Sequence, residues 1–268
     1  MLLKLFRDDV RALPPSDPPV CPPTLARMDA NECPLPPPEP LRRALLELAG
    51  SARLERYPHP AALPLREAFG RRFGVDPRQV IAGAGSNECV SMLLGALARP
   101  GAKVLVPAPS FYMYGVLAKV AGVRVVEVPL TPRFELDADA LEAALERERP
   151  AAVLFASPNN PTGNRFDPVI VERVCRRGDV AVLVDEAYGD YCRADSLPLL
   201  PRHQSLFVLR TLSKAGLAGL RAGFLVGHPE HIALIDRVRQ PYNVTALSQA
   251  LGAVALDRYE LLQGVARQ

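Results

Sequence analysis

Asp185 and Lys214 each follow an apolar segment rich in β-branched residues, and the glycine-rich segment Gly83–Asn87 follows a third. A desolvated lysine with a lowered pKa can act as an amine nucleophile. A carboxylate at the end of a buried strand can pair with a cationic heteroaromatic nitrogen, and a turn that opens a helix can bind an anion such as a phosphate. These three features are therefore candidates for one ligand site.

The surroundings of Lys214 favour such a role. Ser213 precedes it, Arg221 lies seven positions further on, and the small residues 215–220 between them are typical of backbone that approaches a ligand closely. The spacing alone fits a nucleophilic lysine and a lysine in a surface loop equally well.

The other two features also have plainer interpretations. Asp185 could serve as a metal ligand or as the ion-pair partner of an arginine. The segment Gly83–Asn87 fits neither the dinucleotide-binding glycine pattern nor the Walker pattern, and Ser86 could simply be a helix N-cap with Glu88 in the first turn.

The elements that position these residues alternate along the chain. Short β-branched segments predict strands, apolar periodicity predicts helices between most of them, and this alternation indicates βαβ units with a mainly parallel sheet. The last two strands are too close in sequence for a crossover helix, so one of them is expected to be antiparallel. The expected strands cover residues 80–81, 103–106, 123–128, 152–155, 180–184, 206–209 and 222–226, and the expected helices cover residues 41–48, 63–73, 88–98, 137–148 and 169–176, with a last one from about 246.

Ligands bind such sheets outside the carboxyl ends of the strands. Polar, turn-forming residues follow four of the expected strands, which packing alone explains poorly. These four segments are 82–88, 157–163, 185–188 and 210–214.

Bulk properties exclude several classes of protein. The chain has 268 residues, a formal net charge of +3 and no block of basic residues, so a nucleic-acid partner is not expected. The five cysteines are widely spaced, which predicts reduced thiols and no metal site. No signal peptide or membrane span is expected, and the protein is predicted to be cytoplasmic.

The order of these motifs along the chain resembles that of the fold-type I aminotransferases, and within them of the histidinol-phosphate aminotransferases. The similarity runs over nearly the whole length. It rests on the segments Asp29–Glu32, Arg56–Pro58, Gly85–Glu88, Pro109–Phe111, Ser157–Gly163, Asp185–Tyr188, Thr211–Lys214 and Gln240–Val244.

The resemblance implies pyridoxal 5'-phosphate as cofactor and a catalytic group of four residues. Lys214 would form the Schiff base and shuttle the proton, and Asp185 would pair with the pyridine nitrogen. Tyr188 and Asn160 would hydrogen-bond the phenolic oxygen of the ring.

The resemblance also implies the remaining contacts. Phe111 would stack on the ring, where the family more often has tyrosine, and Tyr57 would reach the partner subunit's phosphate in a homodimer. Asn31 and Glu32 would lie on the substrate side. The phosphate would be held by Ser86, Asn87, Ser213 and Arg221.

Two departures from the family pattern stand out. The loop between Lys214 and Arg221 is one residue shorter than usual, which either shifts Arg221 or is absorbed by the two glycines of the loop. The sequence ends at Gln268, where family members continue into a small C-terminal domain that carries a carboxylate-binding arginine. The expected organisation is an N-terminal arm with part of the small domain over residues 1–50, the cofactor-binding large domain over residues 51–268, and no C-terminal small domain.

The expected fold is thus an α/β fold-type I large domain with a mainly parallel seven-stranded sheet and helices on both faces. The expected function is transamination between histidinol phosphate or imidazole-acetol phosphate and the glutamate/2-oxoglutarate pair, in histidine biosynthesis. Decarboxylation of threonine phosphate and aromatic transamination are alternatives on the same fold. A shortened, non-catalytic chain that only binds the cofactor is an alternative of another class.

Overall fold

The computed structural model describes residues 5–15, 22, 28–192 and 195–267. The N-terminal arm expected within residues 1–50 therefore lies partly outside the described residues. Its segment from Met28 to Pro38 contains no helix or strand, and a helix begins at Glu39.

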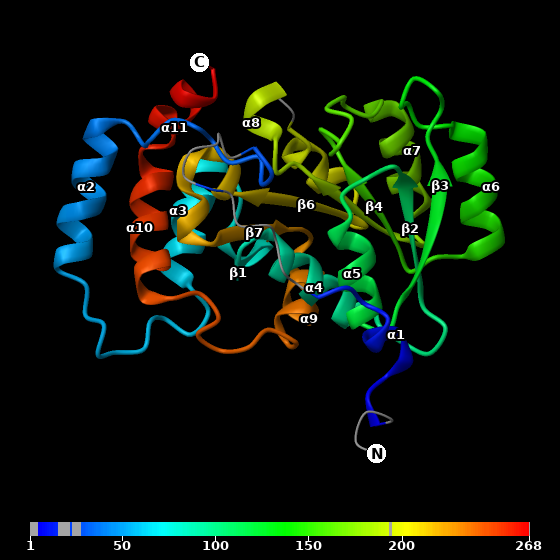
Figure 1. The fold of residues 1–268 in the computed structure, drawn as a ribbon, viewed down its shortest axis with the longest axis horizontal. Helices are drawn as coiled ribbons and strands as arrows, with labels where there is room; N and C mark the ends of the chain where they lie inside the picture. Colours follow the sequence, from blue (N-terminus) through cyan, green and yellow to red (C-terminus); the bar gives the residue numbers. More distant parts are fainter. Residues whose placement is uncertain (1–4, 16–21, 23–27, 193–194, 268) are drawn as a thin grey trace.

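A mixed, seven-stranded sheet forms the centre of the molecule (Figure 1). Its strand order is β1-β7-β6-β5-β4-β2-β3, and β7 runs opposite to the other six strands. This arrangement confirms the prediction of one antiparallel strand in a mainly parallel sheet. The strands are β1 (Val80–Ala84), β2 (Lys103–Ala108), β3 (Arg124–Pro129), β4 (Ala152–Ala156), β5 (Ala181–Asp185), β6 (Leu206–Thr211) and β7 (Ala222–Val226).

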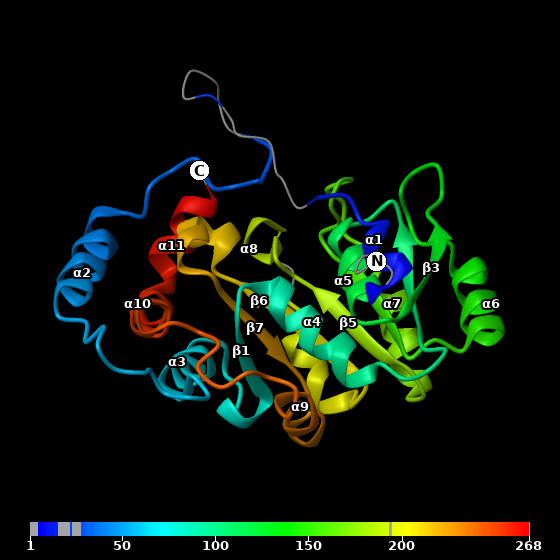
Figure 2. The same cartoon turned by 60° about the horizontal axis from the view of Figure 1, so that its bottom comes forward.

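Helices cover both faces of the sheet (Figure 1, Figure 2). The predicted helices are all present, with bounds that differ by a few residues, and the last one is divided into α10 and α11. Helix α5 is an addition that the sequence had not indicated. The longer helices are α2 (Glu39–Gly50), α3 (Leu63–Phe73), α4 (Ser86–Leu97), α5 (Met113–Val120), α6 (Ala138–Glu148), α7 (Pro168–Arg177), α9 (Pro229–Asp236), α10 (Ala246–Asp257) and α11 (Tyr259–Ala266).

The strands bury side chains on both faces because each face has its own helical layer. On β5, Val182 and Val184 belong to the core under α3, α6, α7, α10 and α11, whereas Leu183 belongs to the core under α4, α5 and α9. Alternate residues of a strand point to opposite faces, so apolar residues are needed at every position of a strand that is covered twice. That is the reason why these strands read as continuous apolar segments.

Local signals in the sequence set the helix ends. The Asp137 side chain accepts hydrogen bonds from the N–H groups of Asp139 and Ala140 at 3.1 and 2.9 Å, and so caps α6. Helix α7 starts with Asp167 as its N-cap and ends at Gly178, whose φ of 72° suits glycine. These residues determine where α6 begins and where α7 begins and ends, and so where the chain enters β5.

Candidate functional site

The candidate residues gather at the carboxyl edge of the sheet. Strands β1, β4, β5 and β6 run in the same direction, so the loops after them meet at one edge. Asp185 is the last residue of β5, and Lys214 follows β6 in a short turn of π-helix, Ser213–Leu217. The predicted convergence of these loops is confirmed.

Lys214 extends its amine into a half-buried space between the arm and the sheet edge. Its Nζ donates a hydrogen bond to the carbonyl oxygen of Ala30 at 2.5 Å and lies 5.6 Å from the ring centroid of Tyr188. Burial lowers the pKa of Lys214, the negative charges of Glu32 and Asp185 raise it, and the positive charge of Arg221 lowers it. A lysine whose pKa is lowered by desolvation is more often neutral and therefore more nucleophilic.

Asp185 is a buried carboxylate with two hydrogen-bond donors. The Tyr114 hydroxyl donates to Oδ2 at 2.7 Å, and the N–H of Ala187 donates to Oδ1 at 2.9 Å. Burial raises the pKa of Asp185, while the two hydrogen bonds and the charge of Lys214 lower it. Such a carboxylate can stay charged if a cation lies against its open side.

Tyr188 joins the arm to the loop after β4. Its hydroxyl accepts hydrogen bonds from Nδ2 of Asn31 at 3.0 Å and from Nδ2 of Asn160 at 3.4 Å. The hydroxyl proton is left to donate to another group. A cavity of about 260 Å³ opens beside these three residues.

Arg221 lies against the turn that opens α4. Gly85, with a φ of 93°, is the N-cap of this helix, so Ser86 is its first residue and not the N-cap. A Cβ on Gly85 would lie 2.3 Å from an Arg221 guanidinium nitrogen, and Arg221 also donates to Oγ of Ser213 at 3.2 Å. The first N–H groups of a helix have no partner within it, so this turn offers N–H groups and a guanidinium to an anion.

The loop between Lys214 and Arg221 brings the arginine to the start of α4. Gly216 adopts a φ of 97° and Arg221 a φ of 48°, and between them the chain turns back toward β7. With this backbone the guanidinium of Arg221 lies against Gly85.

Three predicted residues lie in their expected elements without a direct contact to Lys214. Phe111 precedes α5 and packs edge-on against Tyr114, with ring centroids 5.5 Å apart. Asn87 lies in the first turn of α4, beside Ser86. Tyr57 is 82% exposed and stacks on Tyr242 at 4.6 Å, so it is available to a partner subunit but contributes nothing to the site of its own chain.

Sequence reasoning missed three residues that hold the site in place. Tyr114 orients Asp185, and Glu88 and Asn243 are joined by a hydrogen bond of 2.8 Å beside the turn that opens α4. Tyr114 lies one helical turn after Phe111, which was a usable signal. Asn243 is 155 residues away from Glu88, and no local pattern links them.

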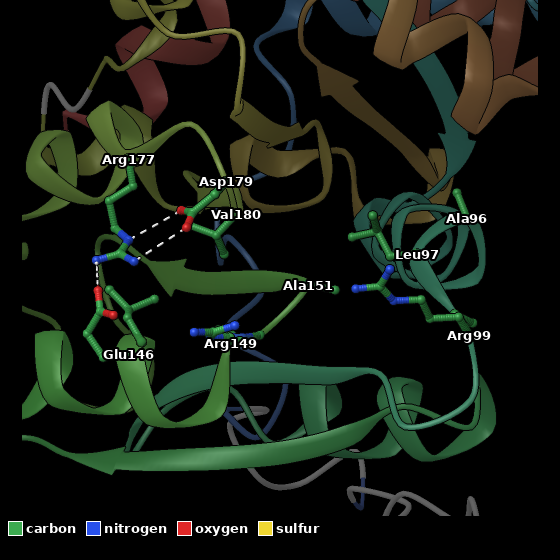
Figure 3. A pocket seen from close by; sticks show the side chains of 12 residues that line it. Ala96, Leu97, Arg99, Glu146, Arg149, Ala151, Arg177, Asp179 and Val180 are labelled. Carbon is green, nitrogen blue, oxygen red and sulfur yellow. Dashed lines mark hydrogen bonds and ion pairs between the residues drawn. The ribbon is translucent and has the colours of Figure 1, made fainter.

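Another cavity, of about 600 Å³, lies at the opposite edge of the sheet (Figure 3). Ala151 and Val180, which precede β4 and β5, line it. Its Arg177 is already paired with Glu146 at 2.7 Å and with Asp179 at 3.3 Å. Ligands of open α/β sheets bind at the carboxyl ends of the strands, so this cavity does not compete with the Lys214 site.

Membrane spans and metal sites are absent among the described residues. No helix there is both long enough and apolar enough to cross a bilayer. No group of three or more His, Cys, Asp or Glu side chains among them is arranged to hold a metal ion.

Known proteins with similar sequences and structures come from one family. The family model of aminotransferase class I and II matches residues 23–266. Histidinol-phosphate aminotransferase 1 of Ralstonia nicotianae is 41% identical over 272 residues, which cover 99% of this chain and 72% of that protein. Histidinol-phosphate aminotransferase 1 of Burkholderia lata is 44% identical over 245 residues, which cover 90% of this chain and 68% of that protein.

The fold agrees with this sequence similarity. The crystal structure of histidinol-phosphate aminotransferase from Sinorhizobium meliloti, in complex with pyridoxal-5'-phosphate, superimposes with a TM-score of 0.83 at 26% identity. The match covers 98% of this chain and 73% of that one. By sequence and by fold, the chain belongs to the class I and II aminotransferases.

Proposed function

We propose that this chain catalyses pyridoxal-phosphate-dependent transamination between histidinol phosphate or imidazole-acetol phosphate and the glutamate/2-oxoglutarate pair, in histidine biosynthesis. The observation that carries this proposal is the half-buried amine of Lys214, which lies in one site with Asp185, Tyr188 and Arg221. The relatives named histidinol-phosphate aminotransferase support the choice of substrate.

The residues present fit pyridoxal 5'-phosphate. Arg221 and Ser213 lie against the start of α4, where a Cβ on Gly85 would occupy the space of the guanidinium. This arrangement suits a dianionic phosphate, which Ser86 and Asn87 would also contact. Asp185 supplies the buried carboxylate that a protonated ring nitrogen requires.

When bound, the cofactor supplies an electron sink for the bond that breaks at the substrate α-carbon. The chain's own residues do the rest. Lys214 would hold the cofactor through its amine and would move the proton at the substrate α-carbon. Asp185 would favour the protonated ring nitrogen, and Tyr188 with Asn160 would hold the phenolic oxygen.

The remaining assignments are part of the same proposal. Asn31 and Glu32 would line the substrate side, since Asn31 bonds Tyr188 and Glu32 acts electrostatically on Lys214. Phe111 would stack on the ring. The exposed Tyr57 would contact the partner subunit's phosphate, which requires a homodimer, and we place the enzyme in the cytoplasm. We assign residues 1–50 to the arm and part of a small domain, and residues 51–268 to the large domain.

The test is turnover of histidinol phosphate with 2-oxoglutarate by this chain, followed as glutamate formed. Lys214→Ala should abolish turnover, and it should also abolish the cofactor absorbance that borohydride bleaches, because both need the amine. Lys119→Ala, on the exposed surface of α5, is the control and should behave like the wild type.

Two outcomes would contradict the proposal. If the chain converts another amino acid at a far higher kcat/KM, it is still an aminotransferase, but histidinol phosphate is not its substrate. Absence of any covalent cofactor adduct in the wild-type chain would refute the assignment of Lys214 itself.

A further inference from the structure

The side chains of Glu88 and Asn243 form a hydrogen-bonded pair, which we call the clamp, behind the turn that opens α4. Oε2 of Glu88 accepts a hydrogen bond from the backbone N–H of Ala84 at 2.5 Å. The same oxygen accepts one from Nδ2 of Asn243 at 2.8 Å, and Nδ2 also donates to the carbonyl oxygen of Ala82 at 3.1 Å. One amide group thus ties the end of β1 to the first turn of α4.

The orientation of the Asn243 amide is well determined. Its nitrogen faces two acceptors, the Ala82 carbonyl and the Glu88 carboxylate, whereas its oxygen faces Nη1 of Arg239 at 3.4 Å. A flipped amide would place oxygen against oxygen on one side and nitrogen against a guanidinium on the other. Arg239 is itself held by Asp236 at 2.7 Å.

The clamp determines which N–H groups of the turn remain available. The N–H of Ala84 donates to Glu88, and the N–H of Gly85 donates to the carbonyl oxygen of Gly83 at 2.7 Å. The free N–H groups of the helix start are therefore those from Ser86 onward, on the side of the turn that Arg221 approaches.

Both hydrogen bonds and packing hold the turn. β1 is at the edge of the sheet and pairs only with β7, so its outer backbone has no strand partner. Asn243 takes the place of that partner at Ala82. A Cβ on Gly223 of β7 would lie 2.4 Å from the backbone of Gly85, so the turn is also pressed against the neighbouring strand.

We propose that Glu88 and Asn243 are positioning residues that fix the anion-binding turn of α4 for the cofactor's phosphate. This inference rests on the proposed function, because it assumes that the phosphate binds at this turn. Neither side chain needs to touch the phosphate. Their effect should therefore be restricted to ligands that carry one.

The experiment compares two ligands on the full chain, pyridoxal 5'-phosphate and pyridoxal. Both are titrated against wild type, Asn243→Ala and Glu88→Ala by the absorbance of the covalent adduct with Lys214. We expect each variant to weaken pyridoxal 5'-phosphate binding at least tenfold while changing pyridoxal binding less than twofold. The control is Glu230→Gln, an exposed acid in the first turn of α9, which should leave both ligands unchanged.

A double variant tests whether the two residues act as one unit. Glu88→Ala/Asn243→Ala should weaken pyridoxal 5'-phosphate binding by less than the product of the two single effects, because the contact that the two residues share is lost only once. If Glu88→Ala does not fold, Asn243→Asp replaces it, because a carboxylate cannot donate to Glu88 or to the Ala82 carbonyl, while Glu88 can still accept from Ala84.

The results that overturn the proposal are distinct from those that overturn the function. If both ligands weaken in parallel, the two residues stabilise the fold and do not position the turn. If the variants bind both ligands as tightly as the wild type does, the clamp is irrelevant to phosphate binding while the proposed function stands. If the wild type forms no adduct with either ligand, both proposals fail together.

Discussion

The Tyr114 hydroxyl lies 2.7 Å from Oδ2 of Asp185, and both side chains are buried between the sheet and α5. Burial raises the pKa of Asp185, and this hydrogen bond lowers it. Burial and the neighbouring carboxylate raise the pKa of Tyr114 well above its ordinary value, so the phenol stays protonated and remains the donor. The net pKa of Asp185 is raised because burial has the largest effect, and Tyr114 offsets part of it and so favours the charged carboxylate where a cationic ring nitrogen would lie.

Tyr114→Phe should therefore weaken cofactor binding without abolishing it. A hydrogen bond to a charged group contributes about 1.5–3 kcal/mol, which corresponds to on the order of tenfold to a hundredfold in affinity. Without it the pKa of Asp185 rises further, so the loss of affinity on acidification should begin at a higher pH than in the wild type. Titration of the cofactor over a series of pH values measures both effects. Tyr112→Phe, at a 74% exposed tyrosine, is the control, and an equal loss there would refute the argument.

The sequence was sufficient to predict the sheet because its central strands, β4 to β7, are covered on both faces. Its apolar segments, such as Val180–Val184, could therefore be recognised without knowing their neighbours. The antiparallel β7 also followed from sequence, since the chain between Leu209 and Ala222 is too short for a crossover helix.

The contacts that complete the site could not be predicted in the same way. Tyr114 reaches Asp185 across 71 positions, and Lys214 reaches the Ala30 carbonyl across 184. Such contacts depend on how layers pack, which periodicity does not encode. The effect of the shorter loop before Arg221 was also open, because a left-handed φ at an arginine is rare and becomes visible only in the folded chain.

Gly85→Ala should selectively damage the anion site. The φ of 93° is unfavourable for alanine, and the new Cβ would lie 2.3 Å from an Arg221 nitrogen, so the guanidinium must move away from the start of α4. Loss of one charge-assisted hydrogen bond predicts about a tenfold or greater loss of affinity for pyridoxal 5'-phosphate.

Gly95→Ala in the same helix is the matched control. No atom lies within 4 Å of a Cβ built there, and alanine is the better helix former, so the free energy of unfolding should rise by about 0.5–1 kcal/mol. Cofactor titration and urea unfolding of both variants measure the difference. If Gly85→Ala binds the cofactor as tightly as Gly95→Ala, Arg221 is not part of the anion site.

Glu32→Gln should make Lys214 reactive at lower pH. Burial already lowers the pKa of Lys214, and the negative charge of Glu32 partly offsets this. Removing that charge lowers the pKa further, so a larger fraction of the amine is neutral at a given pH. The rate at which the cofactor-free protein captures pyridoxal 5'-phosphate should reach half its maximum at a lower pH than in the wild type. Glu47→Gln, on the exposed face of α2, should leave the profile in place, and an upward shift in Glu32→Gln would contradict the sign.

The buried ion pair between Arg210 and Glu186 should dominate the electrostatic contribution to stability. Their side chains are 9% and 1% exposed and lie 2.7 Å apart, and burial raises the pKa of Glu186 while the charge of Arg210 lowers it. Glu186→Ala leaves the charge of Arg210 buried beside the ring of Phe73 but still paired with the half-exposed Asp195 at 3.1 Å. The loss in the free energy of unfolding should therefore be about 3 kcal/mol, the lower end of the cost of breaking a buried pair.

An exposed pair provides the comparison. Arg71 and Asp257 lie 3.0 Å apart, but their side chains are 59% and 50% exposed, so solvent screens the interaction. Asp257→Ala should therefore cost about 0–1 kcal/mol. Urea unfolding of both variants separates the two cases. Equal losses would mean that water reaches Glu186 and Arg210 in the folded protein, and that the pair behaves as a surface contact despite its burial.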